Sequence, residues 1–120
     1  GVCCLRPGIK GVSENINVRS IVGRFLEHTR VFYFHQNGEE LLFCSSADWM
    51  TRNLHHRVEV CFKKKKKRTS DTVIELGLLN YLSDNTQAWS LQSDGSYKRL
   101  KPGTHKPRSA QQLLLEHYCK

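Results

Sequence analysis

The sequence has no long hydrophobic run. No apolar stretch among the 120 residues approaches the roughly 20 residues that a membrane-spanning helix needs, so we expect no membrane span. A charged and then apolar leader of the signal-peptide type is missing as well, and the first residue is not Met. We therefore expect a fragment of a longer cytoplasmic polypeptide, with association to a membrane left open.

Cysteine pairs with zinc-ligand spacing are also missing. The five cysteines include no C-x-x-C pair, which argues against a zinc site, and we expect no metal-binding residues in this chain. Four of the cysteines lie in apolar, strand-like runs, where cysteine behaves as a small hydrophobic residue. We expect these four to be reduced thiols in the core: Cys3, Cys4, Cys44 and Cys61.

Acidic residues are few. Eleven Asp and Glu stand against 19 Lys and Arg, which gives a net charge of +8 and predicts a polyanionic partner such as a nucleic acid, a nucleotide, an anionic lipid or polyphosphate. The densest positive run, "KKKKKR" at residues 63–68, fits the wall of a polyanion tunnel, a solvated loop or a nuclear-targeting signal. Charge alone does not choose among these partners.

Internal repeats and breaks in composition are absent, which predicts a single domain. Alternating and helical hydrophobic patterns indicate about five to seven strands and two or three helices. We expect strands at 2–5, 28–34, 41–45 and 57–62, a strand or a helix at 16–22, a hairpin at 89–100 turned by Asp94-Gly95, a helix that begins at Ser70 or Asp71 and ends near Leu82, and a C-terminal helix capped by Ser109.

The stretch "HTRVFYFHQNGEELLFCSSAD" places charged and polar groups at both ends of a predicted hairpin. Asn37-Gly38 is the strongest short signal for the hairpin turn. If His28 and Arg30 both lie on the first strand, their side chains share one face, about 7 Å apart. Such a pair fits a surface position, a hydrogen-bonded core histidine or one half of a phosphate-handling site.

Two hydroxyl groups and a carboxylate follow the returning strand. Because the far ends of the two hairpin strands lie side by side, Ser45, Ser46 and Asp48 should lie near His28 and Arg30. A phosphoryl-transfer site needs a proton-exchanging group, cations and hydrogen-bond donors in one place. We also expect Ser46 or Asp48 to cap a short helix or a tight turn that follows.

The order H-x-[K/R], hydrophobic strand, turn and small-Ser-x-[N/D] resembles the half-site of the phospholipase D-like superfamily. Four longer blocks resemble the C-terminal region of bacterial polyphosphate kinase: "GVCCLRPGIKGVSENI", "VRSIVGRFLEHTRVFYF", "SSADWMTRNLHHRVEV" and "LSDNTQAWSLQSDGSYKRL". This resemblance implies an α/β fold, with a phospholipase D-like mixed sheet flanked by helices, as one domain over residues 1–120.

The resemblance also implies an activity. Members of that family reversibly move the terminal phosphate of ATP onto inorganic polyphosphate with Mg²⁺, through a phosphohistidine in the preceding domain. His28 then matches the second active-site histidine, an acid/base and phosphate contact, and Arg57 matches an arginine that holds phosphates. Four further residues fall on motif positions expected to bind nucleotide or phosphate: Arg30, Ser45, Ser46 and Asp48.

The complete half-site order, H-x-[K/R] followed by a hydrophobic strand, a turn and small-Ser-x-[N/D], is present once. We therefore expect the isolated fragment to fold, to bind polyanions weakly and to be inactive, with the phosphohistidine and most Mg²⁺ ligands in the upstream domains. The resemblance further implies ATP or ADP and polyphosphate as ligands, and a homo-oligomer in the full-length protein. The alternative from charge is a basic nucleic-acid-binding module.

Overall fold

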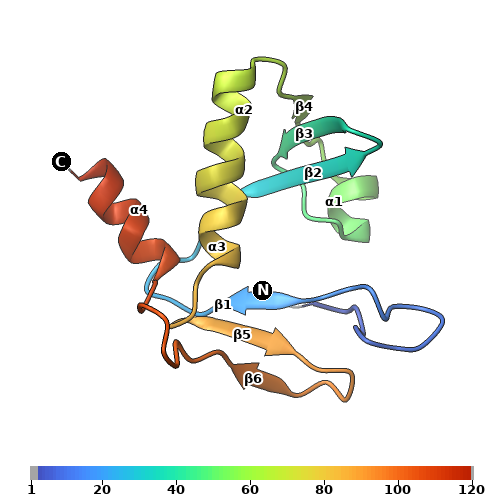
Figure 1. Ribbon diagram of the computed structural model, residues 1–120. Coiled ribbons are helices and arrows are strands. Elements are labelled where there is room, and N and C mark those ends of the chain that lie inside the picture. Colours follow the sequence, from blue (N-terminus) through green and yellow to red (C-terminus); the bar gives the residue numbers. More distant parts are fainter. Residues whose placement is uncertain (1–2, 120) are drawn as a thin grey trace. The chain divides into compact units, whose positions relative to one another are not determined.

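The structure is a computed structural model that describes residues 3–119, so the first residue of the strand expected at 2–5 lies outside the described residues. Residues 3–5 form no strand. The chain folds into two compact units. One contains residues up to 25 together with those from 81 onward, and the other contains residues 26–80. Each unit holds one small sheet (Figure 1).

The 26–80 unit is built on the predicted hairpin. Strand β2 (Arg30–Gln36) pairs antiparallel with β3 (Glu39–Ser45), and β4 (Cys61–Lys63) pairs antiparallel with the other edge of β3. Asn37 and Gly38 have φ angles of 49° and 83°, the positive values that a type I′ turn needs at both central residues. The turn prediction is confirmed, and it sets Arg30 opposite Ser45 at the far end.

Helices complete this unit. The short helix α1 (Thr51–His56) follows β3, and a longer helix runs through α2 (Lys67–Ile74) and the π-helical segment η1 (Glu75–Leu79) into α3 (Asn80–Leu82), where the other unit begins. A Cβ atom on Gly77 would lie 3.4 Å from Cγ2 of Val31, so the missing side chain lets this helix lie close against β2 (Figure 1).

The start predicted for this helix is wrong, whereas its end at Leu82 is confirmed. The helix begins at Lys67, so Ser70 and Asp71 lie inside it. The hydroxyl of Ser70 donates to the carbonyl oxygen of Lys66, four residues earlier, and therefore bonds back along the helix instead of capping it.

The second unit holds the other predicted hairpin. Strands β1 (Arg19–Ile21), β5 (Ala88–Leu91) and β6 (Tyr97–Arg99) form an antiparallel sheet in the order β1-β5-β6. Gly95 in the turn has a φ of 88°, as expected. Helix α4 (Ala110–Tyr118) follows, and Ser109 caps it by accepting a hydrogen bond from the backbone N–H of Gln112, as predicted. The ambiguous 16–22 segment contains a strand because β1 pairs with β5.

A buried carboxylate organises this unit. Asp84 is 1% exposed. Its Oδ1 accepts backbone N–H bonds from Thr86, Gln87 and Ala88, and its Oδ2 accepts the N–H of Ala110 at 2.8 Å. Asp84 thus joins the start of β5 to the start of α4, a role that no sequence pattern indicated.

The fold class is mixed α and β, as expected, but the single mixed sheet is wrong. The described strands form two separate three-stranded sheets, and every neighbouring pair in them is antiparallel. Tight turns and the short α1 connection join β2 to β3, β3 to β4 and β5 to β6. The turns between β2 and β3 and between β5 and β6 are too short for the crossover that a parallel pair requires.

The cysteines are free thiols, as expected, but their predicted place in the core is wrong. Cys44 on the central strand β3 is half-buried, whereas Cys3, Cys4 and Cys61 are exposed. Cys61 lies on β4, an edge strand, and residues 3–5 join no sheet. Within residues 3–119, no helix combines the length and the apolar character needed to cross a membrane.

Candidate functional site

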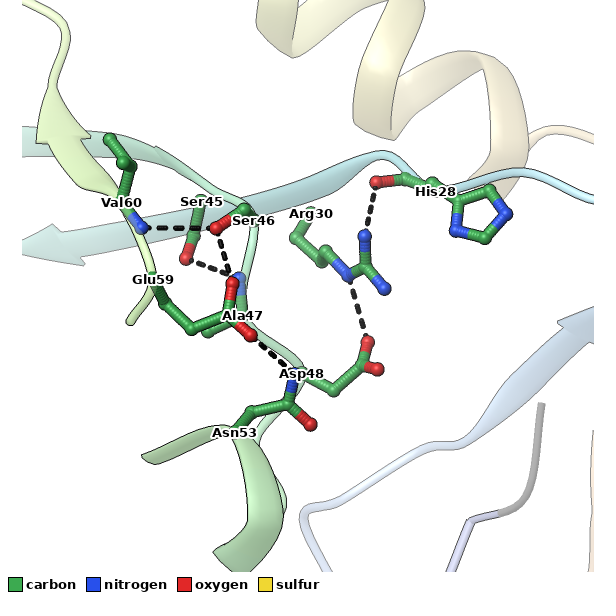
Figure 2. Close-up of polar contacts among 9 residues, drawn as sticks. All are labelled: His28, Arg30, Ser45, Ser46, Ala47, Asp48, Asn53, Glu59 and Val60. Atoms are coloured by element: carbon green, nitrogen blue, oxygen red, sulfur yellow. Dashed lines mark hydrogen bonds and ion pairs between the residues drawn. The ribbon is translucent and has the colours of Figure 1, made fainter. Parts of the chain in front are cut away.

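An ion pair joins the two ends of the β2–β3 hairpin. Arg30 is the first residue of β2, and Asp48 lies in the turn that follows β3. Nε of Arg30 donates to Oδ1 of Asp48 at 2.8 Å, and Nη1 of Arg30 donates to the backbone carbonyl of His28 at 2.9 Å (Figure 2). The sequence prediction that Asp48 lies beside Arg30 is therefore confirmed.

The predicted placement of His28 on the strand is wrong. Strand β2 begins at Arg30, two residues later, and His28 is an exposed residue of the preceding loop. Figure 2 shows the imidazole ring directed away from the guanidinium, so the two side chains do not share one pleat. The reason is that the register ends at the Arg30–Ser45 pair, which leaves residue 28 without a strand partner.

The ion pair fixes the charge of both partners. The hydrogen bond from Arg30 lowers the pKa of Asp48 below its ordinary value, and the charges of Arg52 and His28 add to this effect. The same hydrogen bond raises the pKa of Arg30. Two of the five N–H groups of the guanidinium are engaged in these contacts, so the remaining donors can still meet an anion.

The two serines are held by hydrogen bonds within the protein. Oγ of Ser45 accepts the backbone N–H of Ala47 at 3.0 Å. Oγ of Ser46 donates to Oε2 of Glu59 at 2.5 Å and accepts the backbone N–H of Val60 at 3.0 Å. Because its proton is directed to Glu59, the Ser46 hydroxyl stabilises the end of β3 in this arrangement, and its role as a phosphate ligand stays a prediction.

Glu59 connects that strand end to helix α1. Nδ2 of Asn53, a residue only 3% exposed, donates to Oε1 of Glu59 at 2.7 Å. Hydrogen bonds from Ser46 and then Asn53 lower the pKa of Glu59, and the charge of Arg57 adds to this. Oδ1 of Asn53 is buried and has no hydrogen-bond partner among the described residues.

The sequence did not identify Asn53 or Glu59. Residues 57–60 were expected to be part of a strand, but β4 begins only at Cys61. The sequence signal that could have identified Glu59 is its position as a single acidic residue between two apolar ones, Val58 and Val60. Arg57 directly follows α1 and is exposed. Its positive charge contributes to the lowered pKa of Glu59.

The expected cap of α1 is also wrong. Met50 occupies the N-cap position, and no side chain caps the helix. Ser46 and Asp48 are unavailable as caps because their side chains bind Glu59 and Arg30. In the part of the chain that the structure describes, no group of three or more His, Cys, Asp or Glu residues is arranged to hold a metal ion.

Together these residues form a small polar cluster with one exposed imidazole beside it. The Arg30–Asp48 pair supplies a fixed guanidinium with unused donors, and His28 supplies an exposed imidazole. This combination can bind an anionic oxygen and assist proton transfer, but the cluster contains one such histidine only.

Comparisons with known proteins agree on the relationship. A family model described as "Polyphosphate kinase C-terminal domain 2" matches residues 1–111. A polyphosphate kinase of Pseudomonas aeruginosa is 60% identical over 117 residues, which are 97% of this chain and 17% of the relative. One from Paraburkholderia phytofirmans is 55% identical over 119 residues, or 99% of this chain and 17% of the relative.

A solved structure also shows similarity to a polyphosphate kinase. The crystal structure of polyphosphate kinase from Porphyromonas gingivalis matches 98% of this chain and 18% of its own, with a TM-score of 0.89 and 35% sequence identity. The chain thus spans less than a fifth of the relatives that it matches. On this evidence the chain belongs to the polyphosphate kinase C-terminal domain 2 family.

Proposed function

We propose that this chain supplies one side of the nucleotide- and polyphosphate-binding site of a polyphosphate kinase, an enzyme that reversibly transfers the terminal phosphate of ATP to inorganic polyphosphate. The observation that carries the proposal is the Arg30–Asp48 pair, which holds a guanidinium with unused donors next to an exposed histidine in a chain of this family. Fixed cations of this kind stabilise the charge of a phosphoryl group in transfer.

In this proposal the reacting phosphate is carried by a histidine outside this chain. ATP phosphorylates that histidine and leaves as ADP, and the terminal oxygen of polyphosphate then takes the phosphoryl group. His28 contacts the transferred phosphate and exchanges a proton with the oxygen that leaves or attacks. Arg30 and Arg57 neutralise phosphate charge, while Asp48 keeps the guanidinium of Arg30 in place.

The relation to the phospholipase D-like superfamily is part of the same proposal. Its enzymes use two histidine half-sites, and the H-x-R sequence that precedes a hairpin strand in this chain lies at His28 and Arg30, whereas the other, at His55 and Arg57, lies at the end of α1. The second half-site therefore belongs to the portion of the longer protein that this chain does not include. A cytoplasmic location, where ATP is available, and assembly into a homo-oligomer are further parts of the proposal.

Mg²⁺ is expected with ATP, but the described residues of this chain do not fit a magnesium site. Their carboxylates are dispersed, and Asp48 and Glu59 are already engaged with Arg30, Ser46 and Asn53. We therefore assign the ligands of Mg²⁺ to the nucleotide and to residues outside this chain.

The test is incorporation of γ-labelled phosphate from ATP into acid-insoluble polymer by the full-length protein. His28→Ala should abolish incorporation, because His28 is the imidazole to which this proposal assigns the proton exchange. His35→Ala is the matched control, since His35 is an exposed histidine near the other end of β2. Normal polymer formation by the His28→Ala variant would contradict the assignment.

The net charge of +8 keeps a nucleic-acid-binding module as the second candidate. The two candidate functions predict different outcomes when polyphosphate competes with RNA for the protein. Single-stranded RNA bound to the protein should be displaced by inorganic polyphosphate if the kinase assignment holds, whereas RNA binding that polyphosphate does not displace would favour the module.

A further inference from the structure

Six consecutive cations, Lys63–Arg68, connect the edge strand β4 of the 26–80 unit to the long helix of the same unit. We call them the lysine tract. Lys63 is the last residue of β4, and Lys67 and Arg68 open α2, so the tract occupies the connection between these two elements (Figure 1). Five of the six side chains are exposed. Lys64 is half-buried, with Nζ 6.0 Å from the centroid of the Phe62 ring.

No carboxylate neutralises the tract. Within residues 3–119, none of the six tract side chains takes part in an ion pair at 4 Å or less. The first turn of α2 contains no acidic residue, and its N-cap, Lys66, provides no side-chain bond. Cations at a helix N-terminus are unfavourable because this end of the helix dipole is positive.

The tract therefore does not serve the stability of the fold. Six like charges repel one another and also the helix end that two of them begin, and exposed side chains contribute little packing. A concentrated positive charge that the rest of the described chain leaves unpaired is the feature expected of a surface that meets a polyanion.

We propose that the lysine tract is a second binding site for inorganic polyphosphate, distinct in its residues from the cluster around Arg30 and Asp48. This inference rests on the proposed function. The chemistry of the tract selects a bare phosphate chain, because ammonium groups are point charges without the planar fork of arginine. Single-stranded nucleic acids instead bind where aromatic platforms alternate with the cations, and the tract itself contains no aromatic residue.

The extended part of the tract can touch several phosphates in a row. Lys66 has an extended backbone, and extended residues advance about 3.3 Å each, so the cations before the helix are spread along the chain and not gathered at one point. A long polyphosphate meets many of these cations at once, while tripolyphosphate meets only a few. The tract should therefore favour long chains and hold them while phosphate is added or removed elsewhere.

The experiment compares three variants of the full-length protein. The first, K65Q/K66Q/K67Q, removes three exposed tract charges and keeps side-chain length. The second, K65R/K66R/K67R, keeps the charge. The matched control, K98Q/K101Q/K106Q, removes three exposed lysines from the other compact unit. The probes are end-labelled long-chain polyphosphate, tripolyphosphate and single-stranded RNA of equal charge, each titrated across a salt series.

We expect the K65Q/K66Q/K67Q variant to bind long polyphosphate about tenfold more weakly or worse. For this variant, the slope of the logarithm of the binding constant against the logarithm of the salt concentration should be less steep by about 2. The reason is that each lost phosphate contact removes just under one released counterion. The arginine variant and the K98Q/K101Q/K106Q control should bind as the parent does. In the labelled-ATP assay, the KM for long polyphosphate should rise more than the KM for tripolyphosphate.

Unchanged binding by the K65Q/K66Q/K67Q variant, or an equal loss in the K98Q/K101Q/K106Q control, would overturn the proposal. A larger loss for RNA than for polyphosphate would also overturn it and assign the tract to nucleic acid. The proposed function fails separately, when the parent protein forms no polymer. In that case a selective loss of polyphosphate binding by the tract variant still supports the tract as a binding site.

Discussion

Arg30 and Asp48, 18 residues apart in sequence, are joined by a 2.8 Å contact that fixes how the β2–β3 hairpin ends. The same guanidinium also binds the backbone of His28, so one side chain ties the loop before β2 to the turn after β3. The position of the exposed histidine thus depends on an ion pair that is itself only partly shielded, with side-chain exposures of 23% and 40%.

Arg30→Lys should separate charge from geometry. Lysine retains the positive charge but has one ammonium, which cannot hold Asp48 and the His28 carbonyl in the two directions that a guanidinium reaches. We expect the KM of the full-length protein for ATP to rise by about tenfold, through the loss of charge-assisted hydrogen bonds. The control is Arg108→Lys, which changes an exposed arginine of the other unit. An unchanged KM in the Arg30→Lys variant would contradict a role of the guanidinium geometry in nucleotide binding.

Stability should fall in acid. The pKa values of Asp48 and Glu59 are lowered in the folded protein, by the Arg30 hydrogen bond and by the Ser46 and Asn53 hydrogen bonds respectively. A depressed folded pKa contributes stability above the unfolded value, and this contribution is lost as pH falls through the folded value.

The free energy of unfolding should therefore decrease as pH drops below the ordinary carboxyl values of 3.8 and 4.5. Urea unfolding across a pH series measures this decrease. The D48N/E59Q double variant should show a shallower acid dependence than the parent, because it lacks both titrating groups. Equal slopes for the two proteins would show that these carboxylates do not contribute.

Asn53→Asp tests the link between α1 and Glu59. The change replaces the amide donor by a second carboxylate against Oε1 of Glu59, in a position that is 3% exposed. Buried like charges without a partner are costly, so we expect thermal unfolding to occur about 5–10 °C lower at neutral pH. Asn15→Asp, the same change at an exposed position, should leave the midpoint nearly unchanged, and an equal fall in both variants would refute the link.

Asp84→Asn should weaken the other unit. The amide retains one oxygen for the N–H groups of residues 86–88, but its NH₂ group would face the N–H of Ala110, which is then left without an acceptor. Leaving a buried donor unsatisfied costs about 1–3 kcal/mol in the free energy of unfolding. Urea denaturation measures the loss, with the exposed Asp94→Asn variant as control. A variant as stable as the parent would exclude the bridging role.

Local signals in the sequence determined the turns and one helix start. Asn37-Gly38 and Asp94-Gly95 predict the two hairpins because few residues other than Gly, Asn and Asp accept a positive φ. Ser109 predicts the start of α4 because its side chain can reach the N–H of Gln112 within one turn. The placement of Asp48 beside Arg30 followed from the same reasoning, since a known turn fixes which residues lie opposite each other.

Only the tertiary structure decided where His28, Glu59 and Asp84 lie. His28 leaves the strand because no partner continues the pairing beyond Ser45, and Glu59 becomes part of the site because Ser46 and Asn53 are brought to it from separate elements. Asp84 binds Ala110 across 26 residues. Local conformational preference extends over a few residues, whereas these contacts depend on how distant segments pack, and so the sequence pattern alone did not predict them.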